Sequence, residues 1–102
     1  MTCGSLDKVR AEIDRIDDAI IRLIAERGAV VAQAARFKKD ADGVRDAGRV
    51  EGVIQRVRAK AAEYGADEDM AEVLYREMIR RFVGMEMRAF EGGKTSAEKS
   101  SH

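Results

Sequence analysis

Residues 6–37, LDKVRAEIDRIDDAIIRLIAERGAVVAQAARF, decide the fold of this chain. Apolar side chains recur there at steps of three and four residues, which is the spacing of one face of an α-helix. This apolar seam consists of Leu6, Val9, Ile13, Ile16, Ile20, Leu23, Val30, Ala34 and Phe37. Only Gly28 disfavours helix, so the seam predicts one helix of over thirty residues, about 45 to 50 Å long at 1.5 Å per residue, capped by Ser5 or Asp7.

Such a helix is too long to be covered by the rest of a 102-residue chain. Two shorter helices on one side would leave much of the apolar seam in water. We therefore expect a second copy of the chain to cover the remainder, which predicts a homodimer.

A second, shorter helix is predicted after the polar turn KDADG at residues 39–43. Asp46 is a good residue to cap its beginning, and Gly65 ends it. Its apolar stripe consists of Val50, Val53, Ile54, Val57, Ala61 and Tyr64.

A third helix is predicted to begin at Asp67, with the acidic residues Glu68 and Asp69 in its first turn. Its wide apolar face consists of Leu74, Tyr75, Met78, Ile79, Phe82, Val83 and Phe90. The polar sequence EGGKTSAEKSSH follows, with glycine and serine typical of disorder. We expect a flexible N-terminus over residues 1–5, one all-α helical domain over 6–90 and a disordered tail over 91–102.

Composition excludes several classes of partner and site. Lysine plus arginine and aspartate plus glutamate each number 19, so no overall field favours nucleic acid or an anionic membrane. Cys3 is the single cysteine and His102 the single histidine, so we expect no disulfide within the chain and no metal site. No apolar run is long enough to span a membrane and no signal segment is present, so the cytoplasm is the expected location.

Arg27 interrupts the apolar seam, which makes it the strongest candidate for binding an anion. A guanidinium stays charged, and burying one is costly unless an anion meets it. Lys38 follows eleven residues later, three turns plus about 20 degrees, so both cations share a face. Two simpler interpretations remain: Arg27 could reach water or pair with Glu26 or Glu86, and Lys38 could only complement a helix C-terminus.

Three further positions are candidates for binding the same anion. Glu86 continues the apolar face of the third helix, where a carboxylate is costly unless it is protonated or paired. Asp46 and Arg49 lie where the second helix begins, and a solvated helix start would look the same. Arg10 stands seventeen residues before Arg27 and about 100 degrees around the helix, so it could join one small ligand only from a partner chain.

The sequence resembles the all-helical chorismate mutases and the related isochorismate pyruvate lyases over nearly the whole stretch from Leu6 to Phe90. The resemblance rests on LDKVRAEIDRIDDAIIRLIAERGAVVAQAARFKK, VRDAGRV and GADEDMAEVLYREMIRRFVGMEM. It implies a three-helix protomer, with one long and two shorter helices, intertwined as a homodimer. It also implies a small dianionic enol-pyruvyl substrate and no cofactor.

The resemblance further implies a role for each candidate residue. Arg27 and the partner's Arg10 would bind the two substrate carboxylates, and Lys38 would donate to the ether oxygen. Asp46 and Arg49 would line the site near the ring hydroxyl and a carboxylate. Glu86 stands where many members have a glutamine that donates to the ether oxygen, and it must be protonated to do the same.

Three departures from the enteric chorismate mutases affect the substrate that the resemblance implies. The RFK and RV patterns are closer to the isochorismate pyruvate lyases and their mutase relatives. Val50 replaces a glutamate that holds the ring hydroxyl, and Phe82 replaces a small hydroxyl residue. The leading interpretation is rearrangement of chorismate to prephenate. The alternatives are elimination of pyruvate from isochorismate to give salicylate, rearrangement of 4-amino-4-deoxychorismate, or, from another class, a helical dimerisation module without a ligand.

Overall fold

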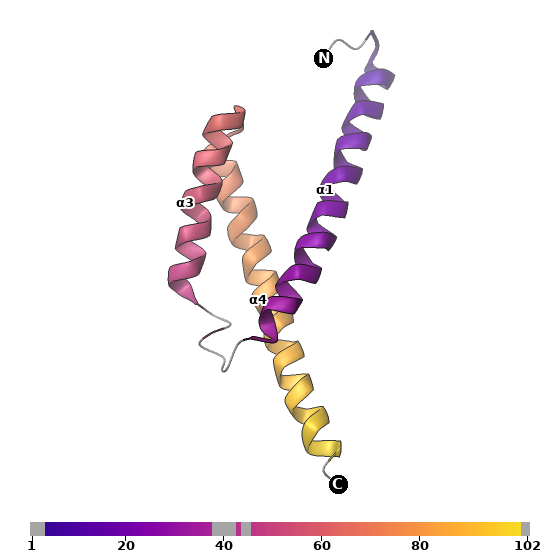
Figure 1. Cartoon of the computed structure of the whole chain (residues 1–102). Coiled ribbons are helices and arrows are strands. Elements are labelled where there is room, and N and C mark those ends of the chain that lie inside the picture. The colour runs from indigo at the N-terminus through magenta and orange to yellow at the C-terminus, as the bar shows by residue number, and fades with distance from the viewer. Residues whose placement is uncertain (1–3, 38–42, 44–45, 101–102) are drawn as a thin grey trace. The chain divides into compact units, whose positions relative to one another are not determined.

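The computed structural model describes residues 4–37, 43 and 46–100, and in them the chain forms three long α-helices and no strand (Figure 1). These helices are α1 (Leu6–Ala35), α3 (Ala47–Tyr64) and α4 (Glu68–Ser100). The predicted all-helical fold class is therefore confirmed over the described ranges. The chain divides into two units, Met1–Gln33, which holds most of α1, and Ala34–His102, which holds α3 and α4.

Helix α1 begins where its sequence predicts and ends slightly earlier. The backbone N–H of Lys8 donates to Ser5 Oγ at 3.2 Å, so Ser5 is the residue that caps the helix. At the other end, the N–H of Phe37 donates to the carbonyl of Ala34 at 3.0 Å, which closes a tighter turn than an α-helical one. This tightening ends α1 at Ala35, two residues before the predicted end.

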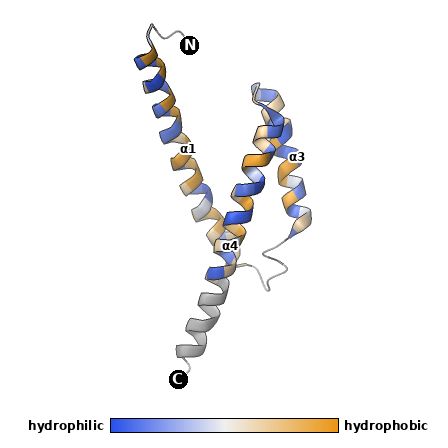
Figure 2. Ribbon diagram, turned by 180° about the vertical axis from the view of Figure 1, so that it is seen from behind, coloured by the Kyte–Doolittle hydropathy of each residue, from blue (hydrophilic) through white to orange (hydrophobic). Residues whose placement is uncertain are grey.

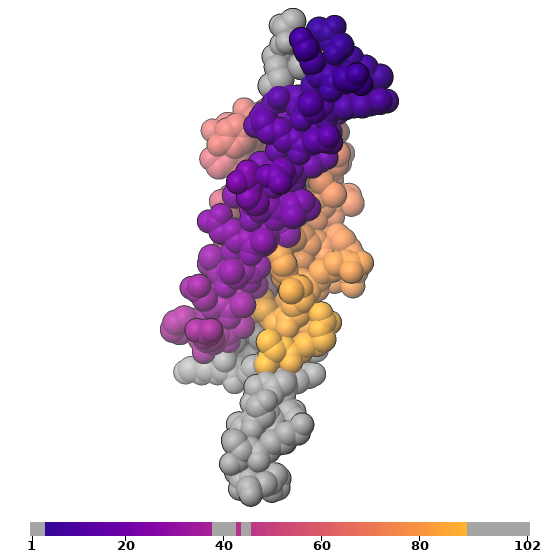
Figure 3. All heavy atoms as spheres, turned by 90° about the vertical axis from the view of Figure 1, so that its right-hand side faces the viewer, coloured from indigo at the N-terminus to yellow at the C-terminus, as the bar shows by residue number. Residues whose placement is uncertain are grey.

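The apolar seam of α1 lies largely in solvent. None of the residues of α1 is buried, although hydrophobic residues recur along the whole helix (Figure 2). Among them, Leu6 is 60% exposed, Ile13 is 49% exposed and Ile20 is 48% exposed. In Figure 3 the side chains of α1 form the continuous row coloured indigo to magenta. An apolar stripe of this extent is typical of a surface that another chain covers.

Helices α3 and α4 form an antiparallel hairpin whose ends follow local sequence signals. Asp46 caps α3, and Gly65 ends it with φ at 77°, a left-handed conformation that suits glycine. Asp67 then accepts the backbone N–H of Met70 at 2.7 Å and caps α4. These three predicted helix boundaries are confirmed.

The hydrophobic core of the hairpin lies between α3 and α4. Its centre consists of Val53, Ile54, Val57 and Ile79, with Val50, Ala71, Tyr75 and Val83 packed around them. Ile54, at 2% exposed, is the most deeply buried of these side chains. Spacing of four residues along α4 brings Ala71, Tyr75, Ile79 and Val83 onto the face that meets α3.

Three sequence expectations differ from the structure or fall outside it. Spacing predicts Tyr64 on the buried stripe, but it is 75% exposed, because it is the last residue of α3 and the chain turns away directly after it. Composition predicts a disordered tail from Glu91, which stays a prediction, while helix α4 extends through Ser100. The expected turn at residues 39–43 lies outside the described residues except for Gly43.

No helix among the described residues is both long enough and apolar enough to cross a membrane.

Candidate functional site

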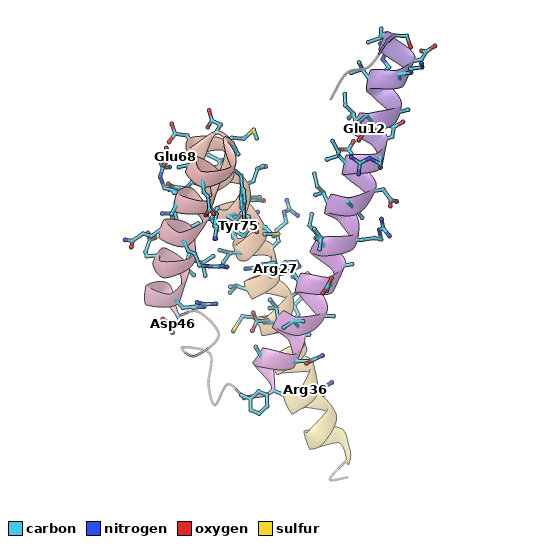
Figure 4. The ribbon with its side chains drawn as sticks, turned by 45° about the horizontal axis from the view of Figure 1, so that its top comes forward. Glu12, Arg27, Arg36, Asp46, Glu68 and Tyr75 are labelled. Carbon is cyan, nitrogen blue, oxygen red and sulfur yellow. The ribbon has the colours of Figure 1, made fainter. Side chains whose placement is uncertain are left out.

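The predicted site residues are distributed over all three helices. Arg10 and Arg27 lie on α1, Asp46 and Arg49 lie at the beginning of α3, and Glu86 lies on α4. Figure 4 labels Arg27 and Asp46 among them. The sixth, Lys38, lies outside the described residues. The structure therefore brings Asp46 and Arg49 together, and places Glu86 on the helix that packs against theirs.

The two arginines of α1 are far apart on their own helix. Arg10 is exposed and Arg27 is partly exposed. Because α1 is continuous from Leu6 to Ala35, the seventeen residues between them correspond to about 25 Å along the axis. One small dianion cannot reach both arginines of a single copy of α1. If both contact one such ligand, they must come from two chains.

The beginning of α3 carries one carboxylate, Asp46, and one guanidinium, Arg49, and both residues are exposed to solvent. The backbone N–H of Arg49 donates to Asp46 Oδ1 at 3.0 Å, which satisfies one of the free donors of the first turn. The guanidinium of Arg49 is exposed and has no hydrogen-bond or ion-pair partner within the described residues. The positive end of the helix dipole and the exposed guanidinium are compatible with a carboxylate ligand, although the carboxylate of Asp46 already accepts one of the backbone donors there.

Glu86 is buried, as its position on the apolar face of α4 predicts. Its exposed fraction is 9%, and it lies seven residues after Ile79 and three after Val83, both on the face that meets α3. A carboxyl group in such surroundings is either protonated or held by a partner, because desolvation penalises the free charge. The burial is therefore compatible with a hydrogen-bond donor and equally with a buried ion pair.

An ion-pair ladder joins α3 to α4, and the sequence did not reveal it. Arg76 donates to both carboxylate oxygens of Glu51, at 2.9 and 3.0 Å, and to Glu72 at 2.7 Å. Arg58 donates to Glu72 at 2.8 Å and to Asp69 at 3.0 Å. The bonds from the guanidiniums lower the pKa of both Glu51 and Glu72. Sequence spacing signals only the Glu72–Arg76 pair; the cross-helix pairs require the register of the hairpin.

A hollow lies toward the far end of the hairpin from Asp46. It has a volume of about 240 Å³ and is lined by residues including Lys60, Tyr64 and Tyr75. The ammonium of Lys60 lies 5.7 Å from the centre of the Tyr64 ring, a cation–π contact. None of the predicted site residues lines this hollow. Across the described ranges, no group of three or more histidine, cysteine, aspartate or glutamate side chains could hold a metal ion.

Comparison with known proteins gives two results. The family model of chorismate mutase type II matches residues 9–87, a range that includes all six predicted site residues. The chain is also 25% identical over 95 residues to a chorismate mutase of Methanocaldococcus jannaschii. That alignment covers 92% of this chain and 96% of the archaeal protein.

Proposed function

The chain belongs to the chorismate mutase type II family, and we propose that it rearranges chorismate to prephenate at two equivalent sites shared between the chains of a homodimer. The observation that carries the activity is the family match, which spans 9–87 without leaving out any of the candidate site residues. The roles of the site residues, the dimer and the choice of substrate are proposals that rest on the residues present and on the resemblance to this family.

The reaction needs positioning and electrostatic stabilisation rather than a nucleophile. In the rearrangement, the ether C–O bond breaks while a C–C bond forms, and negative charge gathers on the ether oxygen. A million-fold acceleration corresponds to about 8 kcal/mol, and one preorganised donor commonly contributes about 3 to 4 kcal/mol. Lys38 and a protonated Glu86, both aimed at the ether oxygen, would account for most of the acceleration.

The arginines would supply the remainder by holding the substrate in its reactive conformation. Arg27 and the partner's Arg10 would each bind a carboxylate, which restricts the substrate to the chair-like form in which the new bond can close. Asp46 and Arg49 would contact the ring hydroxyl and a carboxylate from the beginning of α3. The exposure of Arg49 supports this role.

Two features of α1 support a shared site. Its apolar seam is exposed to solvent. A second copy of the same helix is long enough to cover a surface of that length. Arg10 and Arg27 are also too far apart on one helix to hold a single small dianion. An antiparallel arrangement of two chains would bring the Arg10 of each toward the Arg27 of the other.

The substrate alternatives differ in the ring substituents that the site must recognise. Val50, which stands where the enteric enzymes have a glutamate, is partly buried and packs against the core between α3 and α4. It offers no hydrogen bond to a ring hydroxyl. This loss keeps isochorismate and 4-amino-4-deoxychorismate as the competing substrates, with pyruvate elimination as the competing reaction for isochorismate.

A thermal-shift series combined with turnover assays tests the proposal. Purified protein is mixed with chorismate, isochorismate, 4-amino-4-deoxychorismate or a bicyclic dianionic analogue of the transition state. We expect the analogue to raise the melting temperature most, because a ligand that binds only the folded state stabilises it. Prephenate should form from chorismate. Salicylate formation without prephenate would favour the lyase, and no shift with any compound would favour a helical dimerisation module.

A further inference from the structure

The first turns of α3 have a low intrinsic helix stability, and they carry two of the proposed substrate-binding residues. Its first residues read AGRVEG, so Gly48 and Gly52 bracket the turn that follows Asp46. Glycine lowers helix stability because it loses more backbone freedom than other residues on folding. A Cβ added at Gly52 would meet nothing within 4 Å, so close packing does not account for that glycine. This turn therefore depends on contacts outside its own backbone.

One of those contacts is the bidentate pair between Glu51 and Arg76. The two parallel hydrogen bonds fix both the distance and the orientation of α3 against α4 at this point. A third hydrogen bond, from Arg76 to Glu72 of its own helix, holds the guanidinium in place. Exposed ion pairs contribute little stability by themselves, but bidentate geometry within a network constrains position.

The register of the hairpin relates this pair to the proposed site. Glu51 of α3 lies opposite Arg76 of α4. Arg58 comes seven residues after Glu51, and it lies opposite Asp69, which comes seven residues before Arg76. Continuing the same antiparallel register places Asp46 at the level of Arg81. Glu86 is then five residues further along α4, which is about 7 to 8 Å. Asp46, Arg49 and Glu86 would meet a ligand near this level of the hairpin. Among the ion pairs of the ladder, Glu51–Arg76 is the closest to that level.

We propose that Arg76 and Glu51 are positioning residues for substrate binding: their bidentate pair holds the glycine-rich first turn of α3, and with it Asp46 and Arg49, at a fixed place on α4. This role rests on the proposed function. It predicts that breaking the pair weakens binding of the substrate more than it slows the chemical step.

Arg58 provides a matched control because it bridges the same two helices and shares Glu72, but lies toward the opposite end of the hairpin. The test compares Arg76→Gln with Arg58→Gln. We expect Arg76→Gln to raise KM for chorismate about tenfold with kcat within about threefold, and Arg58→Gln to change KM by less than about threefold. Arg76→Lys keeps the charge but not the paired geometry, so its KM should fall between those of wild type and Arg76→Gln.

Amide hydrogen exchange gives a readout that does not depend on turnover. Exchange over residues 47–52 should accelerate in Arg76→Gln and remain near the wild-type rate in Arg58→Gln. Equal KM changes in the two glutamine variants, or unchanged exchange over residues 47–52 in Arg76→Gln, would overturn the positioning role. Failure of the proposed function is distinguishable, since wild-type protein would then leave chorismate unconverted whatever the exchange pattern.

Discussion

Single residues carry the chemistry of the proposed site, and most of them are recognisable because they break a pattern. Arg27 interrupts an apolar seam and Glu86 interrupts an apolar face, and the structure finds Arg27 partly exposed and Glu86 buried. The cross-helix partners Glu51 and Arg76 break no pattern, because charged residues on exposed helix faces are ordinary. Their pairing depends on how α3 and α4 align, which no local sequence signal contains.

Lys38→Met tests the principal donor. Removing a charged donor that acts chiefly in the transition state should reduce kcat by about two or more orders of magnitude and leave the fold intact. Circular dichroism checks the fold and a prephenate assay gives kcat. A change of less than tenfold with every candidate substrate would mean that Lys38 only complements the end of a helix.

Glu86→Gln tests the second donor through the dependence of turnover on pH. Only a protonated carboxyl group can donate to the ether oxygen, so turnover by the wild type should fall as pH rises and the proton is lost. Glutamine donates at every pH, so the variant should lose this alkaline limb. If wild type and Glu86→Gln show parallel pH profiles, Glu86 is not the titrating donor and the buried-ion-pair interpretation stands.

At the scale of the elements, local side-chain chemistry determines where each helix begins and ends, whereas the packing of neighbouring helices determines which side chains are buried. Ser5, Asp46, Gly65 and Asp67 set helix ends as their side chains and backbone preferences predict. Tyr64 shares the spacing of the buried stripe yet is exposed, because periodicity does not tell where a neighbouring helix stops.

The ion-pair ladder should make the α3–α4 hairpin sensitive to acid. Because pairing lowers the pKa of Glu51 and Glu72 below 4.5, their stabilising contribution is present above that pH and is lost as pH falls below it. The melting temperature of the wild type should therefore drop between pH 5 and pH 3. The double variant Glu51→Gln/Glu72→Gln should show a shallower drop.

A matched control replaces two carboxylates that have no ion-pair partner among the described residues, in Asp14→Asn/Asp17→Asn. It changes the net charge by the same amount and should retain the wild-type acid dependence. If both double variants follow the same curve, general charge effects rather than the ladder govern the response to acid. The expected effect is small in either case, because the paired side chains are partly exposed to solvent.

At the scale of the whole molecule, the proposed site depends on two copies of the chain. The length of α1 was predictable from its apolar seam to within two residues, and the homodimer that the seam predicts stays a prediction. Sedimentation should accordingly detect a dimer at micromolar concentration. No local motif predicts where the second chain lies. The distance between Arg10 and Arg27 along α1 restricts how these two arginines could bind one ligand.

Complementation between inactive variants tests the shared site most directly. Arg10→Ala and Arg27→Ala are each expected to be inactive as homodimers, because each removes a carboxylate ligand from both sites. After the two variants are unfolded together and refolded as a mixture, a heterodimer should hold one intact site and one doubly damaged site. We predict that prephenate formation returns in proportion to the heterodimer fraction. No recovery in a mixture that contains folded heterodimer would show that Arg10 does not act across the interface, and would contradict the shared site.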